Sequence, residues 1–261
     1  MSEIPSWIRQ DYYDQLYFAD KEGKCYLVPG EKGWKVEHWG YRNPNGEFFG
    51  ASAIAKAWKK MFWKYPEIIA TENVAPKLPT FYMLDCGCGR GTFLAYARDE
   101  GMQAIGFDYS DWAVNHPYPR CKKEWLHNWD ATKLWPLSNK DWDLVVALDF
   151  YEHLYTDDID FVIDEMFRVA KKWIFLQIAT VDGVREKGYI LKKGEPVPNE
   201  LQANVVAGPV TVQTAQFWYD KLDDEDFIPR RDLVQWFTAL VPNEIIRNWL
   251  ANTIIVLERV K

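Results

Sequence analysis

The stretch Leu84-Asp85-Cys86-Gly87-Cys88-Gly89-Arg90-Gly91 decides how this chain of 261 residues is organised. An apolar run at 81–84 is typical of a buried strand, and apolar residues recur at helical spacing over 92–98. Glycine permits a tight turn and lets a ligand approach where a Cβ atom would collide. The helix then presents unpaired backbone N–H groups and the positive end of its dipole at this turn. The stretch therefore predicts a strand, a glycine-rich turn and a helix that together hold a ligand.

An acid follows at the end of the next apolar run. Asp108 comes directly after Ala104-Ile105-Gly106-Phe107, which predicts a second buried strand. Its carboxylate can accept hydrogen bonds from both hydroxyl groups of a ribose, and a hydrogen bond to a charged group contributes about 1.5–3 kcal/mol. The order of strand, glycine turn, helix, strand and acid indicates a site for a cofactor that contains adenosine.

The glycine spacing discriminates between classes of cofactor. Dinucleotide dehydrogenases carry G-x-G-x-x-G, whose last glycine allows close helix–strand packing beside a pyrophosphate. Here Thr92 occupies the position where that pattern requires its last glycine, so NAD-dependent oxidoreduction is disfavoured. A P-loop nucleotide site is excluded because the chain contains no G-x-x-x-x-G-K-[ST].

With Asp85, the turn reads D-x-G-x-G-x-G and resembles motif I of the class I S-adenosylmethionine (SAM) methyltransferases. The resemblance covers about residues 78–180 and, more loosely, the rest of the chain. It implies a Rossmann-like α/β fold with a seven-stranded, mostly parallel sheet and helices on both faces. An aromatic-rich N-terminal extension with a hairpin and a helix is expected in addition.

Further segments carry the same resemblance in the family's order. Asp108 matches the ribose-binding acid of motif II, and 142–149 matches motif IV, the fourth strand. Residues 150–154 are similar to the "EHL/EHV" ending of small-molecule methyltransferases of the ubiquinone and menaquinone type, and 172–179 is similar to the fifth strand. Helices are expected over 214–222 and 231–250, with an interruption at Pro242, and a final strand over 253–257.

The resemblance implies SAM as methyl donor, with S-adenosylhomocysteine (SAH) as the product. Asp130 is expected at the adenine amino group, the backbone N–H of Ala131 at the adenine ring, and Tyr109 against the adenine face. The full set of expected cofactor-binding residues is Asp85, Gly87, Cys88, Gly89, Gly91, Asp108, Tyr109, Ser110, Asp130, Ala131 and Leu148.

Two residues after the fourth strand are candidates for catalysis. Methyl transfer is an in-line displacement, so the protein must align the acceptor and, for some acceptors, remove a proton. His153 is the candidate general base because histidine titrates near neutrality, and its alternative role is to cap or pack against the next helix. Asp149 is placed to contact the acceptor or the amino-acid end of the cofactor. Glu152 is expected to hold a neighbouring helix or hairpin by hydrogen bonding.

Two segments are expected to cover the crevice and select the acceptor. Residues 1–75 form an aromatic-rich extension, in which 43–46 predicts a hairpin turn and 51–65 a helix. The methyltransferase domain spans 76–261, with an insertion at about 181–212, and long irregular segments are often lids or binding loops. Either segment is a candidate substrate lid, although the aromatic residues would also fit a small second core. The expected substrate contacts are Tyr12, Tyr13, Trp39 and Tyr41.

Charge and composition narrow the class of methyl acceptor. The net charge of −7 disfavours attraction to phosphate backbones, because such binding depends on clustered lysine and arginine. The segment that resembles motif IV also lacks the N/D-P-P-Y/F signature of enzymes that methylate amino groups of nucleic acids. We therefore expect a small-molecule acceptor. Methylation of a nucleic acid or protein, and SAM binding without catalysis, are the alternatives, and the sequence leaves the oligomeric state open.

The remaining composition predicts a cytoplasmic protein. No apolar stretch approaches the roughly 18 residues of a membrane span, and the N-terminal residues lack the basic and apolar segments of a signal peptide. The four cysteines show no disulfide framework of a secreted protein. Cys86 and Cys88 lie inside the glycine turn, which is poor geometry for a metal site, so no metal is expected.

Overall fold

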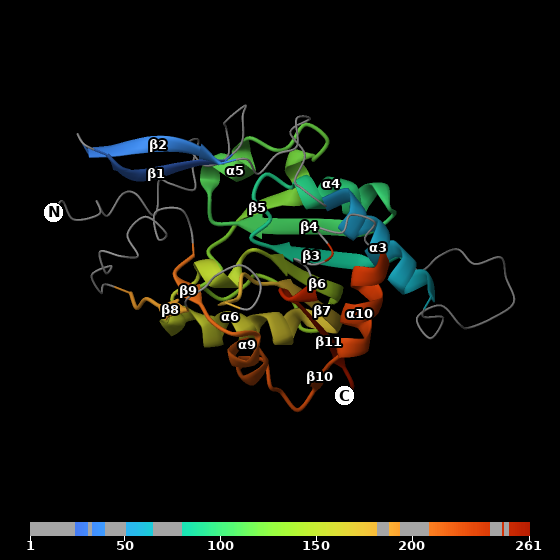
Figure 1. Ribbon diagram of the computed structural model, residues 1–261. Coiled ribbons are helices and arrows are strands. Elements are labelled where there is room, and N and C mark those ends of the chain that lie inside the picture. The colour runs from blue at the N-terminus through green and yellow to red at the C-terminus, as the bar shows by residue number, and fades with distance from the viewer. Residues whose placement is uncertain are drawn as a thin grey trace, which may run out of the picture.

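The computed structural model describes residues 24–30, 33–39, 51–64, 80–181, 188–193, 209–240, 247 and 251–261. A seven-stranded sheet with the spatial order β10-β11-β7-β6-β3-β4-β5 forms the centre of the described part (Figure 1). Its strands are β3 (Tyr82–Cys86), β4 (Gln103–Asp108), β5 (Leu126–Asn128), β6 (Trp142–Leu148), β7 (Ala170–Gln177), β10 (Phe227–Pro229) and β11 (Ile254–Arg259). β5, β4, β3, β6 and β7 are parallel, while β11 is antiparallel to both β7 and β10. The mostly parallel sheet predicted from the sequence is confirmed.

The central strands form because they are apolar on both faces. Along β6, the side chain of Val146 lies in one hydrophobic cluster, whereas those of Val145 and Ala147 lie in the other. Successive side chains of a strand point to opposite faces, so a strand buried on both sides reads as a continuous apolar run. Each cluster is then closed by helices from one side of the sheet.

One face is covered by α3 (Ala51–Lys64), α4 (Thr92–Asp99), α5 (Asp111–Asn115) and α10 (Arg231–Leu240). In α3, Ile54 and Trp58 are buried at helical spacing, and the Trp58 ring centroid lies 4.4 Å from that of Phe175 on β7. The sequence assigns this helix to the N-terminal extension, but its packing makes it part of the core. The division of the chain at residue 75 stays a proposal.

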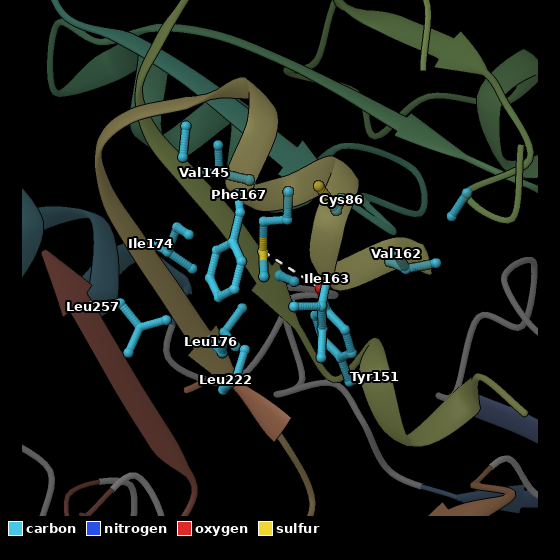
Figure 2. Close-up of a cluster of buried hydrophobic side chains, with 14 of the residues drawn as sticks. Cys86, Val145, Tyr151, Val162, Ile163, Phe167, Ile174, Leu176, Leu222 and Leu257 are labelled. Atoms are coloured by element: carbon cyan, nitrogen blue, oxygen red, sulfur yellow. Dashed lines mark hydrogen bonds between the residues drawn. The ribbon is translucent and has the colours of Figure 1, made fainter. Parts of the chain in front are cut away.

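The other face is covered by α6 (Thr156–Val169) and α9 (Ala215–Lys221). Figure 2 shows how side chains from α6 interdigitate with those of β6, β7 and β11. Within this cluster the Tyr151 hydroxyl donates a hydrogen bond to the Met166 sulfur at 3.5 Å. The core therefore extends up to Tyr151, directly beside the residues expected to act in catalysis.

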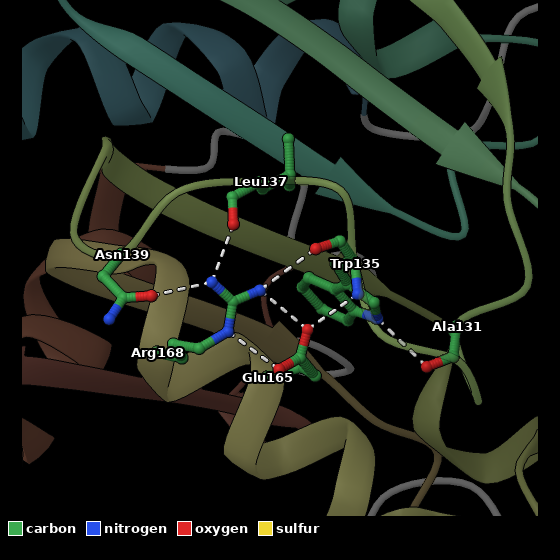
Figure 3. A network of polar contacts seen from close by, with 6 residues as sticks. All are labelled: Ala131, Trp135, Leu137, Asn139, Glu165 and Arg168. Carbon is green, nitrogen blue, oxygen red and sulfur yellow. Dashed lines mark hydrogen bonds and ion pairs between the residues drawn. The ribbon is translucent and has the colours of Figure 1, made fainter.

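A polar network fixes the loop before β6 to α6 (Figure 3). The Arg168 guanidinium forms an ion pair with Glu165 at 2.8 Å and donates hydrogen bonds to the backbone oxygens of Leu137 and Trp135. The Glu165 carboxylate also accepts a hydrogen bond from the Trp135 backbone N–H at 2.8 Å. The hydrogen bonds from Arg168 lower the pKa of Glu165, so this buried acid stays ionised.

Two antiparallel strand pairs and a short strand were not predicted from the sequence. β1 (Lys24–Gly30) pairs with β2 (Gly33–Trp39), upstream of the predicted turn at 43–46, which lies outside the described residues. The insertion contributes an antiparallel pair, β8 (Tyr189–Ile190) and β9 (Thr211–Val212), and β10 was not predicted. α10 ends at Leu240, and Pro242 lies outside the described residues. No helix of the described ranges has the length and apolar character that a membrane span requires.

The strand order reverses at the centre of the sheet. From β3 the chain adds β4 and then β5 on one side, and it returns to place β6 and then β7 on the other. In open α/β sheets, ligands bind beyond the carboxyl ends of the strands at such a reversal. This places the expected crevice beyond Cys86 and Leu148.

Candidate functional site

The glycine turn after β3 has the backbone conformation that its sequence predicts. Gly87, Gly89 and Gly91 have φ values of 72°, 53° and 76°, in the left-handed region that residues with a Cβ atom rarely adopt. The backbone N–H groups of Gly87 and Cys88 both donate to the Phe107 carbonyl oxygen, at 2.9 and 3.0 Å. These bonds fold the turn back onto the end of β4.

Close packing explains two of the glycines in physical terms. A Cβ atom on Gly87 would lie 2.4 Å from Cδ2 of Phe150, the second residue after β6. A Cβ atom on Gly106 would lie 2.6 Å from the Cβ of Cys88 and 2.8 Å from the Asp85 carbonyl oxygen. The turn is thus held between β4 and Phe150, at distances only glycine allows.

Asp108 is tied to the turn by its side chain. One carboxylate oxygen accepts from the Gly89 backbone N–H and the other from that of Ser110, each at 2.8 Å. An ionised carboxylate can accept about four hydrogen bonds, so capacity for ribose hydroxyls remains. Burial raises the pKa of Asp108, and the two N–H donors partly offset this. Tyr109 follows with 48% of its surface exposed, as a ring that packs on a ligand requires.

Asp85 is a second buried acid beside the turn, with 2% of its surface exposed. Burial raises the pKa of Asp85 well above its ordinary value, and the charge of Asp108 raises it further. Within the described ranges, no lysine, arginine or histidine forms an ion pair with either carboxyl. SAM carries a sulfonium and an amino group, and a cationic ligand of this kind would compensate both acids. The residues present therefore fit this cofactor.

The adenine segment after β5 is stabilised locally. Asn128 donates side-chain hydrogen bonds to the backbone oxygens of Asp108, at 3.1 Å, and Tyr109, at 2.9 Å, which joins the ends of β4 and β5. One oxygen of Asp130 accepts from the backbone N–H and the hydroxyl of Thr132, and Ala131 is buried. The Ser110 hydroxyl accepts from the backbone N–H at residue 113 and so caps α5.

The end of β6 brings the two catalytic candidates to the crevice. After half-buried Leu148, Asp149 adopts a left-handed backbone conformation with φ of 50°. Its carboxylate accepts from the Gln177 side-chain amide at 2.7 Å, and its backbone N–H donates to the Gln177 carbonyl oxygen at 2.8 Å. His153 ends the short 3₁₀ helix η3 (Tyr151–His153) and is half-buried.

Glu152, between these candidates, holds neighbouring segments as the sequence predicts. Its carboxylate accepts from the Ala179 backbone N–H at 3.1 Å, and its backbone oxygen accepts from Val210 at 2.7 Å. Thr211 on β9 also donates its hydroxyl to the Leu154 backbone oxygen at 2.9 Å. The end of the 181–212 insertion is therefore attached to the segment that carries His153.

The structure brings most of the expected residues together at the carboxyl ends of β3, β4, β5 and β6. Trp39 ends β2, but its side chain is not among those described, and Tyr12, Tyr13 and Tyr41 lie outside the described residues. In the described part no group of three or more His, Cys, Asp and Glu side chains could hold a metal ion. The roles of all these residues stay proposals.

Three residues were missed by sequence reasoning: Phe150, Gln177 and Asn128. The sequence does single out Gln177, because it is a polar residue inside an apolar strand, and the structure buries it to 1% exposure. The sequence does not single out Phe150, since one more aromatic residue after an apolar strand suggests only core packing.

Comparisons with known proteins agree with this geometry. Residues 84–173, from the glycine turn to the fifth strand, match the family model described as "Methyltransferase domain". No curated protein matches the chain. Among solved structures, the plantazolicin methyltransferase BpumL with a pentazolic desmethylPZN analog and SAH is similar at 12% identity, with a TM-score of 0.51 over 82% of this chain and 84% of that one. Its complex with SAH gives 13% identity and a TM-score of 0.50 over the same shares. Residues 84–173 therefore form a methyltransferase domain of the S-adenosylmethionine-dependent class, and the fold around them is shared with solved methyltransferases.

Proposed function

We propose that the protein transfers the methyl group of SAM to a small-molecule acceptor. When bound, the cofactor supplies a methyl group on a sulfonium centre, which is activated for in-line displacement. The task of the protein is then to hold both reactants in line, and alignment can contribute about 7–11 kcal/mol. The observation that carries the proposal is the presence of acids at the carboxyl ends of β3, β4 and β6, where the crevice is expected.

Carboxyl groups gather where the acceptor would enter. Asp85, Asp108 and Asp149 lie at or directly beyond the ends of β3, β4 and β6. Like charges in a cleft repel an anionic partner, so this edge disfavours the phosphate backbone of a nucleic acid. A neutral or cationic small molecule is free of that penalty.

Basic side chains near the turn are engaged by the protein itself. Arg90 donates to the backbone oxygens of His116, at 2.6 Å, and Pro117, at 3.3 Å. Arg120 forms an ion pair with Asp99, and Lys123 donates to the Val114 backbone oxygen at 2.8 Å. These contacts support a small-molecule acceptor over a nucleic acid, which would need a contiguous basic groove.

The solved neighbour supplies a precedent. The plantazolicin methyltransferase was crystallised with a desmethyl analog and SAH, so this fold accommodates a methyl acceptor that is not a macromolecule. We extend to this chain only the class of acceptor.

Each site residue has a proposed role within this function. Asp108 binds the ribose, Tyr109 packs on the adenine, and Asp130 with the Ala131 N–H reads the adenine edge. Asp149 orients the acceptor or the amino-acid end of the cofactor. His153 removes a proton from the acceptor, a role that contributes about 10²–10⁴-fold where the acceptor requires it. A cytoplasmic location stays a prediction from the sequence.

Methyl-labelled SAM tests the acceptor class directly. We expect label to enter the small-molecule fraction of a cell extract, and to enter it more slowly with His153→Asn. Label confined to the RNA or protein fraction would contradict a small-molecule acceptor. SAM binding with no label in any fraction would instead favour the non-catalytic alternative.

A further inference from the structure

The Glu152 carboxyl group is buried without a hydrogen-bond donor for each of its oxygens. Its side chain is 1% exposed, and one oxygen accepts from the Ala179 backbone N–H at 3.1 Å. The other oxygen, Oε2, is buried and has no hydrogen-bond partner among the described residues. An ionised carboxylate accepts hydrogen bonds but donates none, so this oxygen lacks a donor if Glu152 is charged.

The neighbouring acid is Asp149, which is also an acceptor when ionised. Burial raises the pKa of Glu152 well above its ordinary value, the charge of Asp149 raises it further, and the backbone N–H of Ala179 partly offsets this. Among the described residues, Asp149 is the titratable group that acts on Glu152, and the other contacts are the backbone N–H groups of Ala179 and of Glu152 itself. A single proton shared by the two carboxyl groups would give each of them a hydrogen-bond partner.

We propose that Glu152 carries a proton in the folded protein and donates it in a hydrogen bond to Asp149. Glu152 is then a positioning residue that works with Gln177, which donates to the same carboxylate at 2.7 Å. Two donors from different elements fix the Asp149 carboxylate at the crevice. The effect of Glu152 on catalysis rests on the proposed function of Asp149 in methyl transfer. The protonation of Glu152 does not depend on that function.

The backbone at Asp149 supports a positioning function. A left-handed φ of 50° is uncommon outside glycine and persists where the surroundings hold it. The Gln177 amide and carbonyl groups hold Asp149 from β7, and the proposed hydrogen bond from Glu152 would reach it from η3. The carboxylate is thus oriented from two sides.

Infrared difference spectroscopy of the cofactor-free protein tests for the proton. The wild type minus Glu152→Gln spectrum should contain the carbonyl stretch of a protonated carboxylic acid, and the band should shift in D₂O. Glutamine keeps the shape, the acceptor for Ala179 and a donor toward Asp149, so the variant should fold. Absence of the band from the difference spectrum would overturn the proposal.

Asp149→Asn tests the hydrogen bond itself. Asparagine tolerates the left-handed backbone, so this variant changes the acceptor of the Glu152 proton without forcing a rearrangement. The Glu152 band should shift in frequency, because an amide oxygen is a weaker acceptor than a carboxylate. A merely structural glutamate would give no such dependence, and an unchanged band would overturn the positioning role.

Stability against pH gives an independent check. A folded state that keeps a proton which the unfolded chain releases loses stability as pH rises above the ordinary glutamate pKa of 4.5. Glu152→Gln removes this loss, so its stability relative to the wild type should increase with pH. A constant difference would contradict the protonated state. These experiments use no SAM or acceptor, so their failure is distinguishable from failure of the proposed methyl transfer.

Discussion

Backbone conformation at single residues shapes both sides of the crevice. Gly87 and Gly91 on one side and Asp149 on the other all have positive φ. A side chain with a Cβ atom in this region costs about 1–2 kcal/mol, which explains glycine in the turn. Asp149 is held there by paired hydrogen bonds to Gln177.

Replacing Gly87 with alanine should destabilise the protein more than a matched change at Gly101. Gly101 has φ of 94° but open space around its Cβ position, so Gly101→Ala introduces backbone strain of about 1–2 kcal/mol and no clash. Gly87→Ala adds a collision with Phe150. Denaturant unfolding should show the larger loss for Gly87→Ala, and only that variant should lose affinity for SAM. Equal losses would argue against the Phe150 contact.

The charges of Asp85 and Asp108 should make SAM binding depend on pH. Burial raises the pKa of both acids in the free protein, and binding of a cation favours their ionised forms. Affinity for SAM should therefore rise with pH through these pKa values. SAH, which lacks the sulfonium charge, should respond less. Competition calorimetry across pH measures the ratio of the SAM affinity to the SAH affinity. A ratio that does not change with pH would contradict this account.

At the scale of elements, α6 organises the sheet side that carries the catalytic candidates. Its Arg168 and Glu165 hold the loop that leads into β6, as Figure 3 shows. β6 then ends at Leu148, and the residues that follow reach the crevice. Loss of this network should therefore lower the stability of the whole β6 region.

Glu165→Gln should remove stability in a pH-dependent way. Hydrogen bonds to charged groups contribute about 1.5–3 kcal/mol, and the variant weakens those that Glu165 makes to Arg168. Since the pKa of Glu165 is lowered in the fold, the wild-type advantage should be complete above 4.5 and vanish as pH falls through the folded value. Asn139→Ala, which removes one bond to Arg168 with a neutral acceptor, should give a small loss nearly independent of pH.

The predictability of each element follows from its length and patterning. β6 was predictable because it is a continuous apolar run, and α4 because its apolar residues recur at helical spacing. β10 has three residues and β8 and β9 two each, too few for any period to appear. The cofactor acids were predictable because they end predicted strands, whereas the contact between Phe150 and Gly87 joins residues far apart in sequence. Burial of Glu152 likewise depends on Ala179 and Val210, which only the fold brings near.

At the scale of the whole molecule, the sheet gathers short polar segments from distant parts of the chain at one edge. Acids lie at the ends of β3, β4 and β6, and the strands behind them are buried on both sides of the sheet. Concentrated like charge at this edge opposes folding until a cation neutralises it. Cofactor binding and stability should therefore be linked.

Excess SAM should raise the stability of the folded protein. A ligand at 100 times its dissociation constant adds about 2.7 kcal/mol when it binds only the folded state. Thermal unfolding should show a rise in Tm that grows with SAM concentration for the wild type and for Gly101→Ala. The rise should be lost in Asp108→Asn at the same concentrations, and a Tm unaffected by SAM in the wild type would contradict the linkage.

The most direct test is calorimetric titration of SAM into the wild type and into Asp108→Asn. It shows whether the carboxylate at the end of β4 binds the cofactor. The account predicts one SAM per wild-type chain. It also predicts affinity reduced about a hundredfold in Asp108→Asn, because two hydrogen bonds to a charged group are weakened and about 1.4 kcal/mol corresponds to a factor of ten. Asp157→Asn, at an exposed acid in the first turn of α6, should bind normally. Unchanged affinity in a folded Asp108→Asn, or no SAM binding by the wild type, would contradict the account.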